Sequence, residues 1–203
     1  MDPSRIEFRA GLRDGRSAAT RPARRAMAHP LYAFDPAAGA AGSAHDIALV
    51  ELAQPIRGPV TPFGTAEEVE AGATVSVVSY AVGRSEAPSR EEACGVIGAE
   101  RGVLVLTCDV DFGASGAPIF LMDGSVARIV SVVSAKGELG GRRVALGTSL
   151  TRPLAELRAA MAAASGAALP PQVRTAMAGE RTRVAARFVR VGGDLNAAPP
   201  HPR

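Results

Sequence analysis

One short segment constrains this chain more than any other: a serine set between glycines and followed by an apolar strand. It reads Asp111-Phe112-Gly113-Ala114-Ser115-Gly116-Ala117-Pro118-Ile119-Phe120. Gly113 and Gly116 allow the backbone to turn tightly around Ser115 and leave its hydroxyl uncovered. The N–H groups of Gly113 and Ser115 can then converge on one point, as an oxyanion hole requires. A plain glycine-rich turn between two strands is the alternative, so the context of the motif decides.

Two upstream motifs provide that context. They are His29-Pro30-Leu31-Tyr32 and His45-Asp46-Ile47-Ala48-Leu49-Val50-Glu51-Leu52. The three segments, in this order and spacing, resemble the trypsin-like (chymotrypsin-fold) serine peptidases, and most closely the bacterial branch that includes the glutamyl endopeptidases. The resemblance extends from Arg5 to Ala164. Nothing resembles the T-A-A-H-C segment that carries the family's catalytic histidine ahead of the H-P-x-Y motif, so we expect the chain to begin after that segment.

The resemblance implies roles for several residues. Ser115 is the expected nucleophile and Asp46 the carboxylate that orients the base, while Gly113 and Ser115 supply the oxyanion N–H groups. Ser134 lies 19 positions after Ser115, where the family places a serine that hydrogen-bonds the triad aspartate and lines the substrate channel. Ala135 and Lys136 follow as the expected pocket wall.

Asp109 falls at the base of the specificity pocket if the resemblance holds. An aspartate there selects arginine or lysine in trypsin-type members, which predicts a preference for a basic residue before the scissile bond. Lys136 on the opposite wall can neutralise this charge and reverse the preference toward acidic residues. An exposed loop acid is the alternative interpretation of Asp109.

No histidine is placed as a general base. His45 adjoins Asp46 on an expected strand, so its ring should point to the opposite face. His29 is expected at a strand end, and His201 lies between prolines near the C-terminus. We therefore predict a serine endopeptidase that is inactive as this chain. The alternatives are a non-catalytic relative that binds peptides or a protein partner, and a truncated gene model whose true start lies upstream.

The expected fold is all-β: a chymotrypsin-like double Greek-key β-barrel with an incomplete N-terminal barrel and a C-terminal helix. We expect residues 1–62 to form the partial barrel and the interbarrel connector, 63–166 the second barrel with the helix, and 167–203 a basic, flexible tail in which 183–191 is the one candidate strand. Strands are predicted over 5–12, 18–28, 46–52, 74–82, 93–96, 103–107, 118–122, 126–133 and 143–148, loops over 34–43 and 85–92, and a helix from Thr151, as its cap, to Gly166.

Composition narrows the function further. With 203 residues, 47% of them hydrophobic, the chain can bury a core. The formal charge of +3 comes largely from the chain ends, which argues against nucleic-acid binding. No apolar run is long enough to span a membrane. The two cysteines are too few for metal-site spacing, and no cofactor is expected. The resemblance implies a peptide or protein as the partner, namely the substrate.

The two cysteines are predicted to form a disulfide. Cys94 and Cys108 lie on the two antiparallel arms of a hairpin expected around residues 99–102, so their sulfurs can face each other. An exported protein would keep this bond. The resemblance likewise implies secretion or a periplasmic location, although the stretch from Met1 to Phe8 has no apolar segment of a signal peptide.

Overall fold

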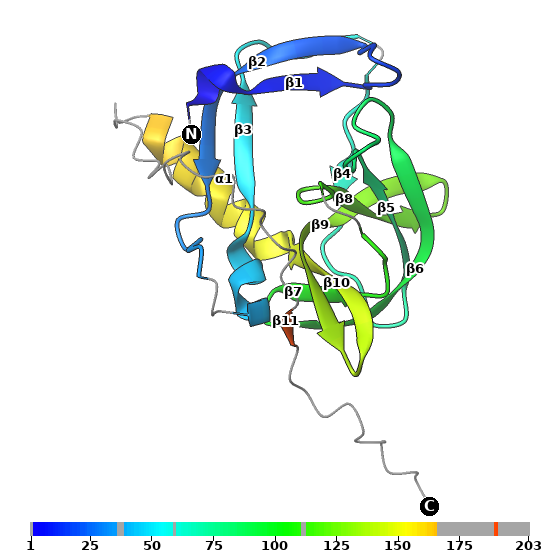
Figure 1. Ribbon diagram of the computed structural model, residues 1–203. Helices are drawn as coiled ribbons and strands as arrows, with labels where there is room; N and C mark the ends of the chain where they lie inside the picture. Colours follow the sequence, from blue (N-terminus) through cyan, green and yellow to red (C-terminus); the bar gives the residue numbers. More distant parts are fainter. Residues whose placement is uncertain (1, 36–38, 59, 111–112, 166–188, 191–203) are drawn as a thin grey trace, which may run out of the picture.

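Two β-sheets and one α-helix account for most of the described chain in the computed structural model (Figure 1). The structure describes residues 2–35, 39–58, 60–110, 113–165 and 189–190. The predicted all-β class with a single C-terminal helix is confirmed. Within the described residues, no helix is both long and apolar enough to cross a membrane.

The first sheet contains three antiparallel strands in the order β1 (Glu7–Ala10), β2 (Ala19–Ala28) and β3 (Ala48–Leu52). A short 3-10 helix, η1 (Pro3–Arg5), precedes it. The predicted Asp14-Gly15 turn follows β1, and both residues have positive φ angles of 51° and 73°. Asp-Gly suits this geometry because both residue types tolerate the left-handed region. The period-two pattern therefore predicted this hairpin correctly.

The second sheet closes on itself as a barrel. Its order is β10-β7-β6-β5-β8-β9, and an additional β9–β10 pairing completes the ring. Two short strands, β4 (Gly64–Thr65) and β11 (Val189–Arg190), pair with β9 in parallel. The six ring strands are β5 (Thr74–Ser79), β6 (Ser89–Glu100), β7 (Val103–Leu106), β8 (Pro118–Asp123), β9 (Val126–Leu139) and β10 (Arg142–Ser149).

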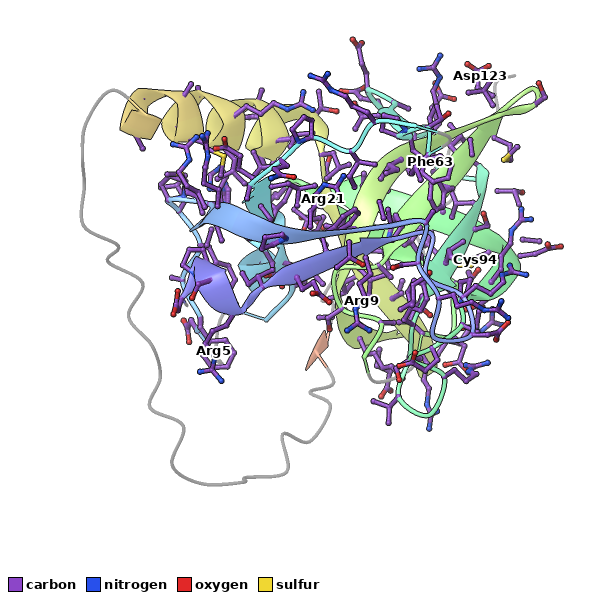
Figure 2. The ribbon with its side chains drawn as sticks, turned by 90° about the horizontal axis from the view of Figure 1, so that it is seen from above. Arg5, Arg9, Arg21, Phe63, Cys94 and Asp123 are labelled. Atoms are coloured by element: carbon purple, nitrogen blue, oxygen red, sulfur yellow. A yellow bond between two sulfur atoms is a disulfide. The ribbon has the colours of Figure 1, made fainter. Side chains whose placement is uncertain are left out.

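Alternating apolar residues of these strands fill the barrel, with Leu106 and Ile119 completely buried. Cys94 in β6 and Cys108 after β7 are disulfide-bonded, with their Cα atoms 4.9 Å apart. Beside them the hairpin continues through a pair of bonds between Gly95 and Thr107. The predicted disulfide is confirmed. Figure 2 shows Cys94 on the barrel, far from Arg5 at the outer end of the first sheet.

Gly147 in β10 is required by space rather than by backbone conformation. A Cβ atom there would lie 2.8 Å from Ile119 Cδ1 and even closer to Ser131 Oγ. We expect Gly147→Ala to lower the free energy of unfolding by about 2 kcal/mol, because overpacking a dense core forces strain. Gly98→Ala in β6 is the matched control, since a Cβ atom added there would meet nothing within 4 Å. Urea denaturation of both variants checks this, and equal midpoints would contradict it.

The helix α1 (Thr151–Ser165) follows β10 and lies against the first sheet (Figures 1 and 2). The helix α1 contacts β2 and β3 of the first sheet. Arg25 of β2 donates a 3.4 Å hydrogen bond to the carbonyl of Met161. Thr151 does not cap the helix through its hydroxyl, which instead donates to the carbonyl of Glu67. The helix therefore joins the two sheets.

Three predicted segments differ in the structure. The expected loop over 34–43 contains a 3-10 helix, η2 (Gly39–His45), because the small Ala40 and Ala44 pack closely against the second barrel. The strand expected from Asp46 begins only at Ala48, and within the described residues no strand pairs with its outer edge. The expected loop over 85–92 ends where β6 begins at Ser89, since these polar residues pair with β5.

Candidate active site

Ser115 occupies the apex of a tight turn directly before β8. Ala117 N–H donates to Ala114 O at 2.9 Å, and Gly116 takes a φ of 79° at the third turn position. A positive φ at that position is the signature of a type II turn, which glycine accepts without strain. Ser115 precedes it with its side chain exposed. The turn thus presents the hydroxyl to solvent, as the glycine pattern predicted.

Gly113 satisfies a second requirement of the same loop. Its φ is 88°, and a Cβ atom there would lie 3.0 Å from Val82 N. A side chain is therefore disfavoured both by conformation and by space. Among the described residues, the N–H groups of Gly113 and Ser115 have no hydrogen-bond partner. Both remain available to an external acceptor.

Asp46 lies between η2 and β3 and is held by the second barrel. Its Oδ2 accepts a 2.7 Å hydrogen bond from Ser134 Oγ. Its backbone carbonyl accepts a 3.0 Å bond from Thr148 Oγ1, and Thr148 is completely buried. The predicted Ser134–Asp46 bond is therefore present. Thr148 was not anticipated, since a lone threonine in an apolar strand carries no sequence signal.

A β-bulge in β9 accounts for the position of Ser134. The register against β10 pairs Leu146 with Ala135 but Gly147 with Val133, so Ser134 has no partner of its own. Bulges of this kind re-aim a side chain at a site. Its neighbour Val133 accepts a 2.7 Å bond from Gly116 N–H. Two adjacent residues of β9 thus hold the Ser115 turn and the Asp46 carboxylate.

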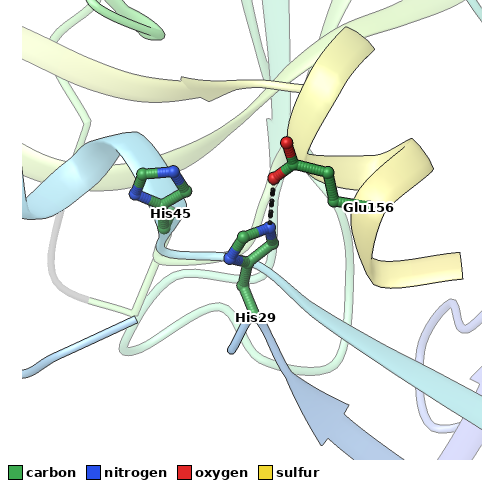
Figure 3. Close-up of side chains that lie close together, drawn as sticks. All are labelled: His29, His45 and Glu156. Atoms are coloured by element: carbon green, nitrogen blue, oxygen red, sulfur yellow. Dashed lines mark hydrogen bonds and ion pairs between the residues drawn. The ribbon is translucent and has the colours of Figure 1, made fainter. Parts of the chain in front are cut away.

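His29 and His45 lie together beside the helix α1 (Figure 3). Their ring centroids are 4.8 Å apart. His45 belongs to η2 and not, as expected, to a strand, so the argument from alternating strand faces was wrong for it. No hydrogen bond joins either ring to Ser115 among the described residues. His201 lies outside the described residues.

Both nitrogens of His29 are engaged. Leu31 N–H donates to Nδ1 at 3.2 Å, which leaves the proton on Nε2, and Nε2 donates to Glu156 Oε2 at 3.1 Å. His29, His45 and Glu156 together offer three ligand atoms within 4.8 Å. A metal on Nε2 would, however, require a proton on Nδ1, directly against the Leu31 N–H. The arrangement fits a buried hydrogen-bonded link between β2 and α1 better than a metal site.

The contacts of Glu156 with Arg152 and His29 predict a pH-dependent stability. The Arg152 hydrogen bond, with a smaller contribution from His29, lowers the pKa of the Glu156 carboxyl below its ordinary value. A carboxyl with a lowered folded-state pKa stabilises the fold above its unfolded-state pKa and loses this effect as pH falls through the folded value. We expect Glu156→Gln to lower the urea midpoint at pH 7, with the gap closing near about pH 3. Glu68→Gln, at an exposed glutamate, is the control. A difference between the midpoints that persists in acid would contradict this pH dependence.

The expected pocket residues do not all come together. Asp109 is exposed, and its backbone N–H donates to Glu91 Oε1 at 2.9 Å. It lines a small open hollow at the ends of β5 and β6 whose charged groups are Arg84, Arg90, Glu91 and Asp109. Ala135 and Lys136 lie half-buried in β9 and do not line this hollow. Glu91 was missed because its segment was interpreted as loop.

Comparison with known proteins agrees with this geometry. Residues 5–127, which contain both Asp46 and Ser115, match the trypsin-like peptidase domain. The chain belongs to the trypsin-like peptidase family. No curated protein matches this trypsin-like domain in sequence.

Among solved structures, the domain is similar to mouse neuropsin, a serine protease expressed in the limbic system of the brain. The match has a TM-score of 0.56 and 15% identity, and it covers 70% of this chain and 72% of the neuropsin chain. At this low sequence identity, the similarity to neuropsin shows a shared fold alone. It agrees with the chymotrypsin-like barrel expected from the sequence.

Proposed function

We propose that this trypsin-like domain is a serine endopeptidase of the bacterial branch that includes the glutamyl endopeptidases, with Ser115 as nucleophile and Asp46 as orienting acid. The observation that carries the proposal is the convergence on β9. Val133 O holds the Ser115 turn, and Ser134 Oγ, one residue on, holds the Asp46 carboxylate. A serine turn and a carboxylate anchored at adjacent residues of one strand support the roles of nucleophile and acid in a catalytic triad.

The chemistry proposed for Ser115 is acyl transfer. Its Oγ would attack a peptide carbonyl, the oxyanion would bind the N–H groups of Gly113 and Ser115, and the amine would leave to give an acyl-enzyme. The serine proton must pass to a base within hydrogen-bond reach. No described histidine occupies that position, and we propose that the chain is inactive for this reason.

An added base tests this proposal on the full chain. Imidazole at high concentration should increase the rate at which a fluorophosphonate modifies Ser115, read by mass spectrometry of the tryptic peptide, because it supplies the missing proton acceptor. Ser115→Ala should abolish the imidazole-dependent modification. Asp46→Asn should reduce it, since an amide does not stabilise imidazolium. A rate of Ser115 modification that does not depend on imidazole would contradict the proposal.

A non-catalytic peptide-binding relative is the second candidate. It is favoured by the histidine pair, since His29 and His45 are occupied with each other and with Glu156. Such a protein would bind extended peptides with equal affinity in the native chain and in Ser115→Ala. It would show no imidazole-dependent modification of Ser115.

Specificity and location are part of the same proposal. With Asp109 beside Glu91, we propose that an active form prefers a basic residue before the scissile bond, and equal cleavage of library peptides after leucine and arginine would contradict this.

We further propose secretion or a periplasmic location. The Cys94–Cys108 disulfide supports it, because such bonds persist in oxidising compartments.

A further inference from the structure

The β1–β2 hairpin extends from the first sheet to the second barrel (Figure 1). Near its tip, Leu12 O accepts a 2.8 Å hydrogen bond from the Tyr80 hydroxyl. At the tip itself, Asp14 N–H donates to Glu86 O at 2.7 Å. Both barrel residues lie in the connection between β5 and β6, so the hairpin holds that connection at two points. We refer to these two hydrogen bonds as the hairpin clamp.

Between the two points of the clamp, residues 81–84 form a tight turn. Arg84 N–H donates to Ala81 O at 2.9 Å, and Gly83 has a φ of 83° at the third turn position. Such a positive φ is typical of a type II turn, which glycine adopts without strain. Ala81 is buried, whereas Val82 at the second turn position is 76% exposed. The apex of the turn therefore projects from the barrel.

This apex lies directly against Gly113. A Cβ atom added at Gly113 would lie 3.0 Å from Val82 N and 3.2 Å from Val82 Cγ2. Atoms in such close contact cannot move toward each other, so a displacement of the turn displaces the Gly113 backbone. The hairpin clamp, the turn and Gly113 thus form one continuous series of contacts, which begins in the first sheet and ends two residues before Ser115.

We propose that Tyr80 is a positioning residue for the Gly113 N–H, acting through Val82 and the turn that the hairpin clamp holds. An oxyanion donor is effective only when it is aimed at the position where the negative charge develops. The first sheet would in this way orient the oxyanion side of the site, in addition to supplying Asp46. The role in catalysis rests on the proposed function, whereas the coupling of Tyr80 to Gly113 does not.

Nuclear magnetic resonance of the full chain, isotopically labelled at glycine, tests this coupling. Tyr80→Phe removes the hydroxyl and keeps the ring, and it should shift the Gly113 amide resonance. Thr20→Val is the matched control, because it removes a 2.8 Å hydroxyl bond to Ser17 within the same hairpin but outside the clamp. It should leave the Gly113 resonance in place. Identical Gly113 resonances in the native chain and in Tyr80→Phe would overturn the proposal.

A double substitution tests whether the effect passes through the turn. Val82→Ala removes the Cγ2 contact with Gly113 and is the positive control for the shift. Val82 is exposed, so this variant is expected to fold. Because residues that act through one shared contact are not additive, Tyr80→Phe should shift the resonance less in the Val82→Ala background than in the native chain. Equal additional shifts in both backgrounds would overturn the role of Val82.

The imidazole-dependent modification of Ser115 tests the consequence for the site. Tyr80→Phe should lower its rate about tenfold, since a small displacement of a group that acts in the transition state is costly. Thr20→Val should leave the rate unchanged, and circular dichroism verifies that each variant is folded. An unchanged rate in Tyr80→Phe would overturn the positioning role. If the native chain shows no such modification, the proposed function fails, and the Gly113 resonance still decides whether the coupling exists.

Discussion

In the absence of an added base, a fluorophosphonate should modify Ser115 of this chain no faster than it modifies an ordinary exposed serine. Removal of the triad histidine from such an enzyme costs on the order of 10⁶ in turnover, and no described histidine is hydrogen-bonded to Ser115. His29 is buried against Glu156, and His45 packs against His29. If the N–H groups of Gly113 and Ser115 form the proposed oxyanion hole, they alone would leave only residual rate enhancement. Time-resolved labelling followed by mass spectrometry measures this directly.

The matched controls are substitutions of the proposed nucleophile and of the two described histidines. Ser115→Ala should remove the slow labelling of this position. His29→Ala and His45→Ala should leave the slow labelling unchanged. Rapid labelling of the native chain that either of these histidine variants removes would show that a described histidine acts as the base after all.

Loss of the disulfide should be the largest single perturbation of stability. Cys94→Ser with Cys108→Ser should lower the free energy of unfolding by roughly 3 kcal/mol, because the bond closes a loop of about 15 residues in the unfolded chain. Both cysteines are buried in the barrel core, so the serine hydroxyls add to the loss. Urea denaturation at equilibrium measures the change.

A pair of controls separates the cross-link from the packing. Cys94→Ala with Cys108→Ala removes the bond without burying hydroxyls and should recover part of the loss. Thr107→Ala removes the adjacent bond from Gly95 N–H to Thr107 Oγ1 but leaves the disulfide intact, and should cost about 1 kcal/mol. A doubly substituted chain as stable as the Thr107→Ala variant would show that the cross-link contributes little.

Local chemistry explains what could be predicted from the sequence. The Ser115 turn depends on glycines that accept positive φ angles, and the first hairpin depends on Asp14-Gly15 between alternating residues. Both signals lie within a few residues. The disulfide followed for the same reason, since its two cysteines flank one hairpin. The order of the motifs then pointed to Asp46 and to its bond with Ser134.

Long-range packing determined the parts that could not be predicted. The hydrogen bond from His29 to Glu156 joins residues that are 127 positions apart in the sequence, and no local sequence pattern predicts it. The bulge that turns Ser134 toward Asp46 arises from the register between β9 and β10, which the residue pattern of β9 alone does not specify. The 3-10 helix η2 has an alanine- and glycine-rich sequence that is equally typical of a loop, and only its contacts with the second barrel determine its form.

The anchoring of Asp46 by Ser134 and Thr148 means that the acid side of the site is assembled by the second barrel, while Asp46 itself comes from the end of the first sheet. The carboxylate is therefore oriented whether or not a base is present. If Ser115 and Asp46 act as proposed, a base could be gained, lost or supplied from outside without rebuilding the anchors of either residue. The proposed activity would then depend on the presence of a single imidazole.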